Sequence, residues 1–297
     1  MNPNSNKPIS DNIEISLIIP VFNEENSIDA TISDLKSVLK NVDFSFEIIM
    51  VDDGSTDSSL ELLKNYSSEI TLIKHEQNRG YGASLKSGVL KAKGKNIIIT
   101  DADGTYPSKT IIEIKQELKG NDMVVGARIG SKVHIPVIRK PAKWFINKLA
   151  NYLSGIKIPD LNSGLRGIKK DLILKYFHLL PDGFSFTTTI TLALSCASYK
   201  VKYIPIDYGK RVGKSKIRPI HDTLNFVKLI FRTVLYFNPI KVFLPFSLLL
   251  IFTSAGLFLY RIFYQDAFVV SIVVLFISGI QLLALGVIAD LIVRRAK

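Results

Sequence analysis

The chain has 297 residues, with 38 lysines and arginines against 26 acidic residues and a formal net charge of +12. This length allows one sizeable α/β domain and a smaller additional region. The single cysteine, Cys196, excludes disulfides within the chain and cysteine-clustered metal sites. The positive charge is compatible with nucleic acid, anionic lipid or phosphorylated ligands as partners.

The first part of the chain has the pattern of an α/β domain. Residues 1–12 are polar and lack the apolar stretch of a signal peptide, which favours a cytoplasmic location. Strand-like apolar runs then alternate with helical patterns, which is typical of a parallel sheet with crossover helices. The expected strands are Ser16–Val21, Glu47–Val51, Ile70–Lys74, Ile97–Thr100 and Asp122–Gly126. The expected helices are Ser27–Leu39, Ser58–Tyr66, Ala83–Lys93 and Ser108–Leu118, followed by Arg139–Ser154, Asp171–Leu180 and Thr187–Tyr199.

Polar clusters follow three of the expected strands. Pro20 to Glu25 close the first strand, Asp52 to Asp57 the second, and Asp101 to Thr105 the strand that ends at Thr100. Because the carboxyl ends of parallel strands share one edge of a sheet, the three clusters are expected to meet in one crevice. The Asp101 and Asp103 carboxylates can both reach a hard divalent cation that also holds a diphosphate. A solvated acidic turn is the alternative for this pair taken alone.

An amphipathic helix is expected between Ile220 and Phe237. Its apolar residues recur at helical spacing, and a second stripe carries basic and polar side chains. The apolar stripe is Leu224, Val227, Phe231 and Val234, and the other is His221, Asn225, Lys228 and Arg232. Such a helix suits the lipid headgroup layer. Packing against the preceding domain is an alternative that does not exclude this role.

The C-terminal region contains two long apolar runs, Val242–Tyr260 and Ala267–Ala289. At about 1.5 Å per residue even the shorter run extends roughly 28 Å, close to the hydrocarbon thickness of a bilayer. The short connection Arg261–Asp266 predicts a helical hairpin. Basic residues flank both outer ends, so the positive-inside rule places both flanks in the cytoplasm. A hairpin buried in a soluble core is the alternative. With a membrane hairpin present, lipid and phosphate are expected as ligands, and nucleic acid is not.

These motifs resemble the family 2 glycosyltransferases, which have the GT-A fold. The resemblance is carried by the segments Ile18–Glu25, Val51–Asp57, Asn78–Gly82 and Asp101–Gly104. The segments Asn162–Arg166 and Gly213–Lys216 narrow it to polyprenyl-phosphate glycosyltransferases of the dolichol-phosphate mannose synthase type. The resemblance covers about residues 14 to 220. It implies a Rossmann-like, mostly parallel sheet flanked by helices, followed by a two-helix transmembrane hairpin. The expected regions are a catalytic domain (1–219), a juxtamembrane helix (220–241) and the hairpin with its basic tail (242–297).

The resemblance also assigns residues to roles. The residues expected to hold the nucleotide sugar are Pro20, Asn23, Glu24, Asp52, Asp53 and Asp101. Asp101 and Asp103 are expected to bind Mg²⁺ or Mn²⁺, and Thr105 stands where many relatives have glutamine, which leaves a third protein ligand open. The expected acceptor-phosphate residues are Arg128, Arg139, Ser163, Lys214 and Lys216. Either Lys210 or Arg211 is expected to clamp the diphosphate, and the forked guanidinium favours Arg211 as a catalytic residue.

The implied function is a membrane-anchored inverting glycosyltransferase on the cytoplasmic face of the cell membrane. It would move a hexose from GDP-mannose or a UDP-hexose to a polyprenyl phosphate, such as undecaprenyl or dolichyl phosphate. A phosphate acceptor needs no strong general base, because its second pKa is near 6. Direct glycosylation of a glycolipid, diacylglycerol or polysaccharide is the enzymatic alternative. A membrane-anchored nucleotide-binding assembly partner is the non-enzymatic alternative, and the formation of a homo-oligomer is left open.

Overall fold

The computed structural model describes residues 13–129, 148–152, 154–155, 157–209, 219–264 and 269–295, and for residues 219–226 it describes the backbone only. Seven strands form one sheet in the order β3-β2-β1-β4-β6-β5-β7. Six of the strands run parallel to one another, and β6 is antiparallel to both of its neighbours, β4 and β5. The strands are β1 (Ile15–Val21), β2 (Phe46–Asp52), β3 (Thr71–Lys74), β4 (Asn96–Ile99), β5 (Met123–Ala127), β6 (Arg166–Lys169) and β7 (Val201–Pro205).

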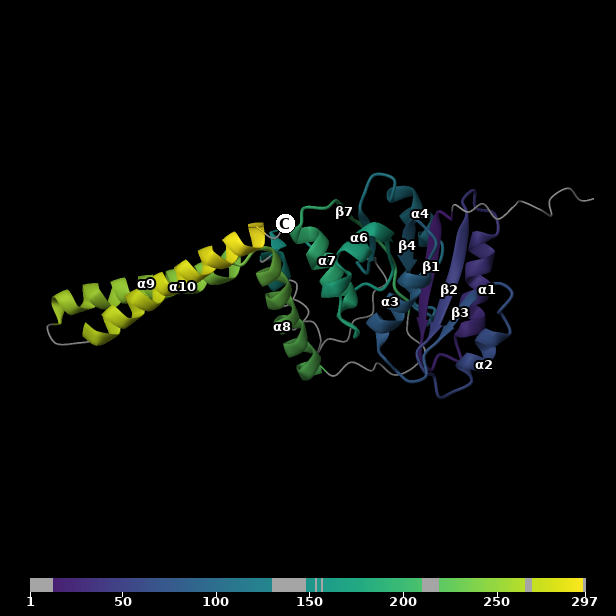
Figure 1. Ribbon diagram of the computed structural model, residues 1–297, viewed down its shortest axis with the longest axis horizontal. Coiled ribbons are helices and arrows are strands. Elements are labelled where there is room, and N and C mark those ends of the chain that lie inside the picture. The colour runs from purple at the N-terminus through teal and green to yellow at the C-terminus, as the bar shows by residue number, and fades with distance from the viewer. Residues whose placement is uncertain are drawn as a thin grey trace, which may run out of the picture.

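Helices cover both faces of the sheet, as the crossover pattern predicts (Figure 1). One apolar cluster joins α1, α2 and α4 to the strands, and a second cluster joins α3, α6 and α7 to the opposite face. These helices are α1 (Ile28–Leu39), α2 (Ser59–Lys64), α3 (Tyr81–Lys91), α4 (Thr110–Glu117), α6 (Lys170–Lys175) and α7 (Phe186–Cys196). A mostly parallel sheet between two helical layers is therefore confirmed.

The five strands expected up to residue 126 are all present, but β6 and β7 were missed. Strand β6 reads Arg-Gly-Ile-Lys, with only one large apolar residue, and strand β7 is short and ends at Pro205. Neither segment has the continuous apolar run on which strand recognition depends. Most of the helix expected at Arg139–Ser154 lies outside the described residues, and residues 148–152 are helical.

The helix α8 (Pro219–Phe237) packs on the α/β domain, which was the alternative considered from its sequence. Its buried side chains Ile230 and Val234 join an apolar cluster with residues of α7 and of the 150–161 segment. Phe237 joins the larger core cluster on the α7 side of the sheet. On the outer side, Lys228 and Arg232 are exposed. The apolar face of α8 is thus covered by protein, while a basic face meets the surroundings.

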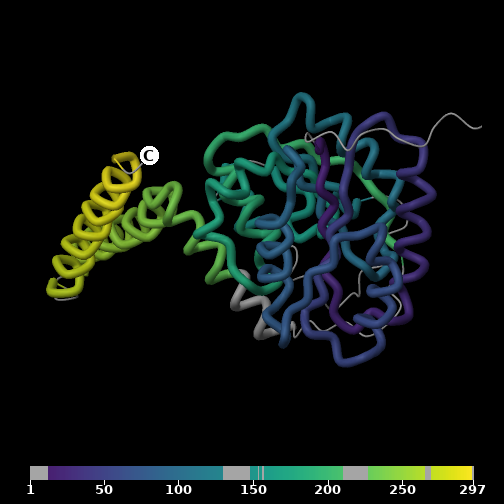
Figure 2. Tube along the Cα trace, turned by 45° about the vertical axis from the view of Figure 1, so that its right-hand side comes forward, coloured from purple at the N-terminus to yellow at the C-terminus, as the bar shows by residue number. Residues whose placement is uncertain are grey.

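Two long apolar helices end the chain, α9 (Ile240–Phe263) and α10 (Val269–Arg295). Both are long and apolar enough to cross a membrane, with mean hydropathies of 2.2 and 2.6 and only 17% and 11% of their most apolar stretches buried. Core helices of soluble proteins are mostly buried, so these exposed apolar faces indicate a membrane anchor. Figures 1 and 2 show the two helices side by side, projecting away from the sheet beyond α8.

Small residues bring the two helices of the hairpin into close contact. The hydroxyl of Ser247 donates to the carbonyl of Gly279 over 2.8 Å, and that of Ser254 donates to the carbonyl of Ile272 over 2.8 Å. A Cβ added at Gly279 would lie 2.6 Å from a side-chain carbon of Ile251. Close packing of small residues and hydrogen bonds between helices are the contacts that stabilise helix pairs in a membrane. The hairpin is therefore a packed unit with an apolar outer surface.

Candidate active site

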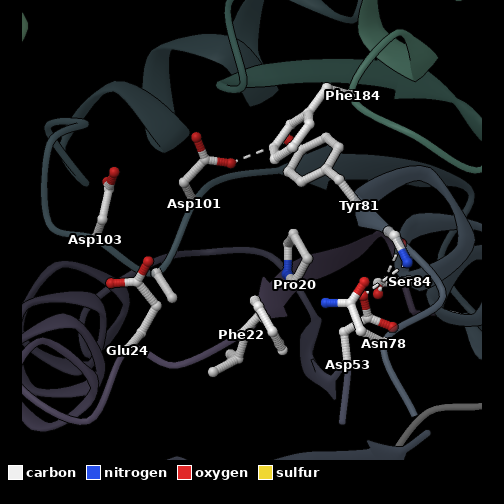
Figure 3. A pocket seen from close by; sticks show the side chains of 13 residues that line it. Pro20, Phe22, Glu24, Asp53, Asn78, Tyr81, Ser84, Asp101, Asp103 and Phe184 are labelled. Atoms are coloured by element: carbon white, nitrogen blue, oxygen red, sulfur yellow. Dashed lines mark hydrogen bonds between the residues drawn. The ribbon is translucent and has the colours of Figure 1, made fainter. Parts of the chain in front are cut away.

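A pocket of about 360 Å³ opens at the carboxyl ends of β1, β2 and β4. The three strand-end segments that were expected to meet in one crevice do so here, because their strands are neighbours in the sheet. Residues of α3 and of the loop before α7 complete the wall (Figure 3). The lining residues are Pro20, Val21, Phe22, Glu24, Asp53, Asn78, Gly80, Tyr81, Ser84, Asp101, Ala102, Asp103 and Phe184.

Asp101 and Asp103 lie in the loop after β4, and both line the pocket. The hydroxyl of Tyr81 donates to Oδ1 of Asp101 over 3.0 Å. Oδ1 of Asp103 accepts hydrogen bonds from the hydroxyl and the backbone N–H of Thr105, at 2.6 and 3.2 Å. Gly104, between Asp103 and Thr105, has a φ of 67°, in the left-handed region that favours glycine. The loop thus directs two carboxylates into the pocket and restrains each of them.

The backbone of the Asn162–Arg166 segment packs directly behind Asp101. A Cβ added at Gly164 would lie 2.7 Å from one carboxylate oxygen of Asp101 and 2.9 Å from the other. The backbone N–H of Gly164 donates to the Tyr106 hydroxyl over 2.7 Å, which fixes this approach. Only glycine allows the segment to lie so close to the Asp101 carboxylate.

Asp53 lies on the pocket wall that β2 contributes, but its carboxylate is occupied by donors of the protein. Oδ1 accepts from the backbone N–H of Arg79 and contacts Nδ1 of His75 at 2.7 Å, and Oδ2 accepts from the N–H of Gly80. Nε2 of His75 in turn contacts the Ser87 hydroxyl at 2.9 Å. Asp53 therefore anchors the 75–80 loop, which places Asn78 and Gly80 in the pocket wall.

Of the other residues expected to bind the nucleotide, Pro20 and Glu24 line the pocket. The side-chain oxygen of Asn23 accepts from the N–H of Thr56 over 2.8 Å, so Asn23 joins the first and second strand-end loops. Asp52 is fully buried, and within the described residues its Oδ1 has no hydrogen-bond partner. Neither Asn23 nor Asp52 is among the residues that line the pocket.

The donor set in the pocket fits a hard divalent cation. Mg²⁺ is usually held by one or two carboxylates together with substrate phosphates, rather than by a cage of protein ligands. The described residues contain no cluster of three or more His, Cys, Asp or Glu side chains that could hold a metal. Asp101 and Asp103 supply carboxylate oxygens beside a pocket of the size of a ligand site, which matches this pattern.

The expected acceptor-phosphate residues occupy different environments. Nε and Nη2 of Arg128 donate to the two carboxylate oxygens of the buried Asp160, at 2.7 and 2.9 Å. Burial alone would lower the pKa of Arg128, but the hydrogen bonds and charge of Asp160, together with Tyr106, raise it above its ordinary value. Ser163 is fully buried and donates to the Gly126 carbonyl, so its hydroxyl supports the loop. The remaining residues, Arg139, Lys210, Arg211, Lys214 and Lys216, lie outside the described part of the chain.

Tyr81, Gly164 and Phe184 are among the residues of the site that were not assigned a role from the sequence. Tyr81 and Gly164 belong to segments that carry the family resemblance, so their motifs were a usable signal. Burial and the nearby charge of Asp101 raise the pKa of Tyr81 well above its ordinary value, so the hydroxyl keeps the proton that it donates. Phe184 lies in a short loop with no motif, and nothing in its sequence indicates a place in the pocket.

Two family models match separate parts of the chain. The model of "Glycosyl transferase family 2" matches residues 16–177, and that of "GtrB C-terminal hairpin" matches residues 238–294. The dolichyl-phosphate beta-glucosyltransferase of Dictyostelium discoideum is 29% identical over 76% of this chain and 76% of its own length. The dodecaprenyl-phosphate galacturonate synthase of Rhizobium johnstonii is 26% identical over 98% of this chain and 90% of its own length.

A solved structure confirms the fold of the N-terminal region. Glucosyl-3-phosphoglycerate synthase from Mycobacterium tuberculosis, in complex with Mn²⁺, UDP and phosphoglyceric acid, superposes with a TM-score of 0.59. The two are 16% identical, and the match covers 76% of this chain and 80% of that one. The family model spans more than half of the chain, including every strand-end segment of the pocket. The chain therefore belongs to glycosyl transferase family 2, and it is a glycosyltransferase with the GT-A fold.

Proposed function

We propose that the protein transfers a hexose from a nucleotide-diphosphate sugar to a polyprenyl phosphate at the membrane surface. The observation that carries this proposal is the combination in one chain of an acidic pocket at the sheet edge with an exposed apolar hairpin. The same pocket in a protein without a membrane anchor would be expected to act on a soluble acceptor. Relatives named for dolichyl-phosphate and dodecaprenyl-phosphate substrates support the lipid-phosphate assignment.

The pocket suits a donor that carries a base, a ribose and a diphosphate. Pro20, Glu24 and Asn78 form the wall for the nucleoside, and the carboxylate of Glu24 offers an acceptor for a base N–H or a ribose hydroxyl. Asp101 and Asp103 would hold Mg²⁺ or Mn²⁺ against the diphosphate. When bound there, the cation supplies positive charge that stabilises the departing nucleoside diphosphate.

The reaction needs little acid–base chemistry. An oxygen of the acceptor phosphate forms a bond to the anomeric carbon of the sugar, while the bond from that carbon to the donor diphosphate breaks. The electron pair leaves with the nucleoside diphosphate, and no proton has to move, because the acceptor phosphate is already ionised near neutral pH. Attack in line with the leaving group inverts the anomeric configuration. The protein contributes alignment of the two substrates and charge stabilisation.

The acceptor phosphate requires positive charge between the pocket and the membrane. Arg128 supplies a guanidinium whose Nε and Nη2 are held by Asp160, which leaves the Nη1 edge outside these bonds. Arg139 and the basic segment from Arg211 to Lys216 are expected to add charge, with Arg211 on the diphosphate.

The membrane hairpin holds the active site near the membrane surface. Lys241 lies in the first turn of α9, and Arg294 and Arg295 end α10. Both of these helix ends lie toward the α/β domain (Figure 1), which by the positive-inside rule is the cytoplasmic side. The exposed Lys228 and Arg232 of α8 suit a contact with anionic headgroups. A lipid phosphate would then meet a donor bound at the sheet edge.

A lipid-product assay tests the proposal. Purified protein is incubated with GDP-mannose or with UDP-hexoses, Mn²⁺ or Mg²⁺, and undecaprenyl phosphate, and the lipid product is identified by mass spectrometry. We expect a polyprenyl phosphate carrying one hexose, and no product from the matched neutral alcohol undecaprenol. Equal transfer to undecaprenol or to diacylglycerol would refute the phosphate acceptor and favour direct glycosylation of a lipid. The variant Asp103→Asn serves as the inactive control.

A further inference from the structure

We infer that Tyr81 is a positioning residue, which holds the carboxylate of Asp101 in the orientation that a bound divalent cation requires. This inference rests on the metal site proposed above and adds a residue that acts through Asp101. The Tyr81 hydroxyl donates to Oδ1 of Asp101 over 3.0 Å, and both side chains line the pocket (Figure 3). A carboxylate that accepts such a bond presents its remaining lone pairs in a fixed direction.

The backbone around Tyr81 is held by the 181–183 loop. Gly80 has a φ of 102°, and a Cβ added there would lie 2.6 Å from the carbonyl oxygen of Asp182. The N–H of Ala83 donates to that same carbonyl over 2.9 Å. Nζ of Lys86 lies 2.7 Å from the Asp182 carboxylate and ties α3 to the loop a second time. The side chain of Tyr81 therefore projects from the first residue of α3, where the backbone has little freedom.

The ring of Tyr81 is held by Phe184. The two rings are stacked, with centroids 5.7 Å apart and planes inclined by 18°. Phe184 has 60% of its surface exposed although it is a large apolar side chain, and it lines the pocket. Stacking against Phe184 limits rotation of the Tyr81 ring, so the hydroxyl stays directed at Asp101.

Asp101 is confined from another direction as well. The missing Cβ of Gly164 leaves room for the carboxylate, with 2.7 Å between that position and one carboxylate oxygen. The hydrogen bond from Tyr81 and the contact with Gly164 together select one orientation of a side chain that otherwise turns about two bonds. Partners of this kind, which orient a ligand without touching the metal, typically contribute about 10- to 100-fold to metal affinity.

Mn²⁺ binding measured by electron paramagnetic resonance provides a test that does not depend on turnover. The wild type and Tyr81→Phe are titrated with Mn²⁺ in the presence of saturating UDP, and in parallel with GDP. Tyr81→Phe keeps the ring and its stack on Phe184 and removes only the donor. Tyr176→Phe is the matched control, because Tyr176 is buried in the cluster on the α6–α7 face, away from the pocket lining.

We expect Tyr81→Phe to bind Mn²⁺ roughly tenfold more weakly than the wild type. Its affinity for UDP and GDP, measured separately by calorimetry without metal, should be unchanged. Tyr176→Phe should match the wild type in both measurements. Unchanged Mn²⁺ affinity in Tyr81→Phe would overturn the inference, and so would an equal loss of nucleotide affinity without metal. If the wild type binds no Mn²⁺ with either nucleotide, the proposed metal site itself fails, which is a separate result.

A second variant tests the same inference if Tyr81→Phe does not fold. Phe184→Leu removes the stacked ring from a largely exposed position, so little packing is lost. Because the stabilising free energy of an aromatic pair is small, we expect Phe184→Leu to bind Mn²⁺ roughly two- to tenfold more weakly than the wild type. Wild-type Mn²⁺ affinity in a folded Phe184→Leu would show that the stack does not position Asp101.

Discussion

Replacing Gly164 with alanine tests how closely the site is built around Asp101. The added Cβ would lie 2.7 and 2.9 Å from the two carboxylate oxygens of Asp101, whereas ordinary van der Waals contact begins at 3.4 Å. One of the two partners therefore has to move by roughly 0.7 Å, as happens when a packed site receives an extra methyl group.

The Asp101 side chain should be the partner that moves. The N–H of Gly164 donates to Tyr106, and the preceding carbonyl, that of Ser163, accepts from the buried guanidinium of Arg166 at 3.1 Å from Nε. These bonds hold the backbone, while the carboxylate turns about two single bonds. The free energy of unfolding should fall by only about 1 kcal/mol, the low end for overpacking. The displacement of the Asp101 carboxylate should lower turnover about 10- to 100-fold, which corresponds to an activation free energy higher by roughly 1.4 to 2.7 kcal/mol.

The assay compares the rate of sugar transfer, the Mn²⁺ concentration for half-maximal rate and the melting temperature. Gly183→Ala is the matched control, because a Cβ there has no heavy atom within 4 Å although the residue neighbours Phe184 in the pocket wall. Gly164→Ala should lose turnover and need more Mn²⁺, while the control should not. Wild-type turnover and metal dependence in Gly164→Ala would refute the reasoning that the orientation of Asp101 limits the reaction.

Three further predictions follow from the site and the hairpin. Asp103→Asn should lower turnover at least about 100-fold with little change in melting temperature, and full wild-type activity in excess chelator would contradict a metal requirement. With the native cysteine replaced, an impermeant thiol reagent applied from outside should label Phe263→Cys but not Arg295→Cys in whole cells, and the reverse pattern would invert the topology. Arg128→Ala should raise the KM for polyprenyl phosphate by roughly tenfold or more and leave the KM for the donor unchanged. An equal rise in both KM values would contradict the assignment of Arg128 to the acceptor site. The single variant Asp160→Asn keeps the Arg128 cation and removes only the ion pair. Comparing it with Arg128→Ala separates the effect of losing the ion pair from the effect of losing the cation.

The positions of the carboxylates were predictable because strand-end chemistry is local. Each strand that feeds the pocket is a continuous apolar run followed at once by polar residues, as at Val51 to Asp53 and Ile99 to Asp103. Parallel pairing of β1 with β2 and with β4 then brings these ends together without any further information. The two long apolar helices were predictable for a similar reason, since length and hydropathy are local properties, and their low burial in the structure then distinguishes them from core helices.

The residues that orient the carboxylates were not predictable, because their contacts join segments far apart in the sequence. Tyr81 reaches Asp101 across 20 residues, and Gly164 reaches it from the loop before β6, a strand too short and polar to be recognised. The insertion of antiparallel β6 between β4 and β5 is what carries this loop behind the pocket.

Arg128 shows how such a long-range contact changes a functional interpretation. From the sequence it is expected at the acceptor phosphate because of the family resemblance, with an ordinary strand-end charge as the alternative. In the structure Asp160, 32 residues later and almost fully buried, takes Nε and Nη2 in a two-point contact. A planar guanidinium held along one edge by a carboxylate has a fixed direction for its other edge. A phosphate bound by Arg128 would therefore meet a cation whose orientation is already set, and the cost of ordering that side chain has been met by folding rather than by binding.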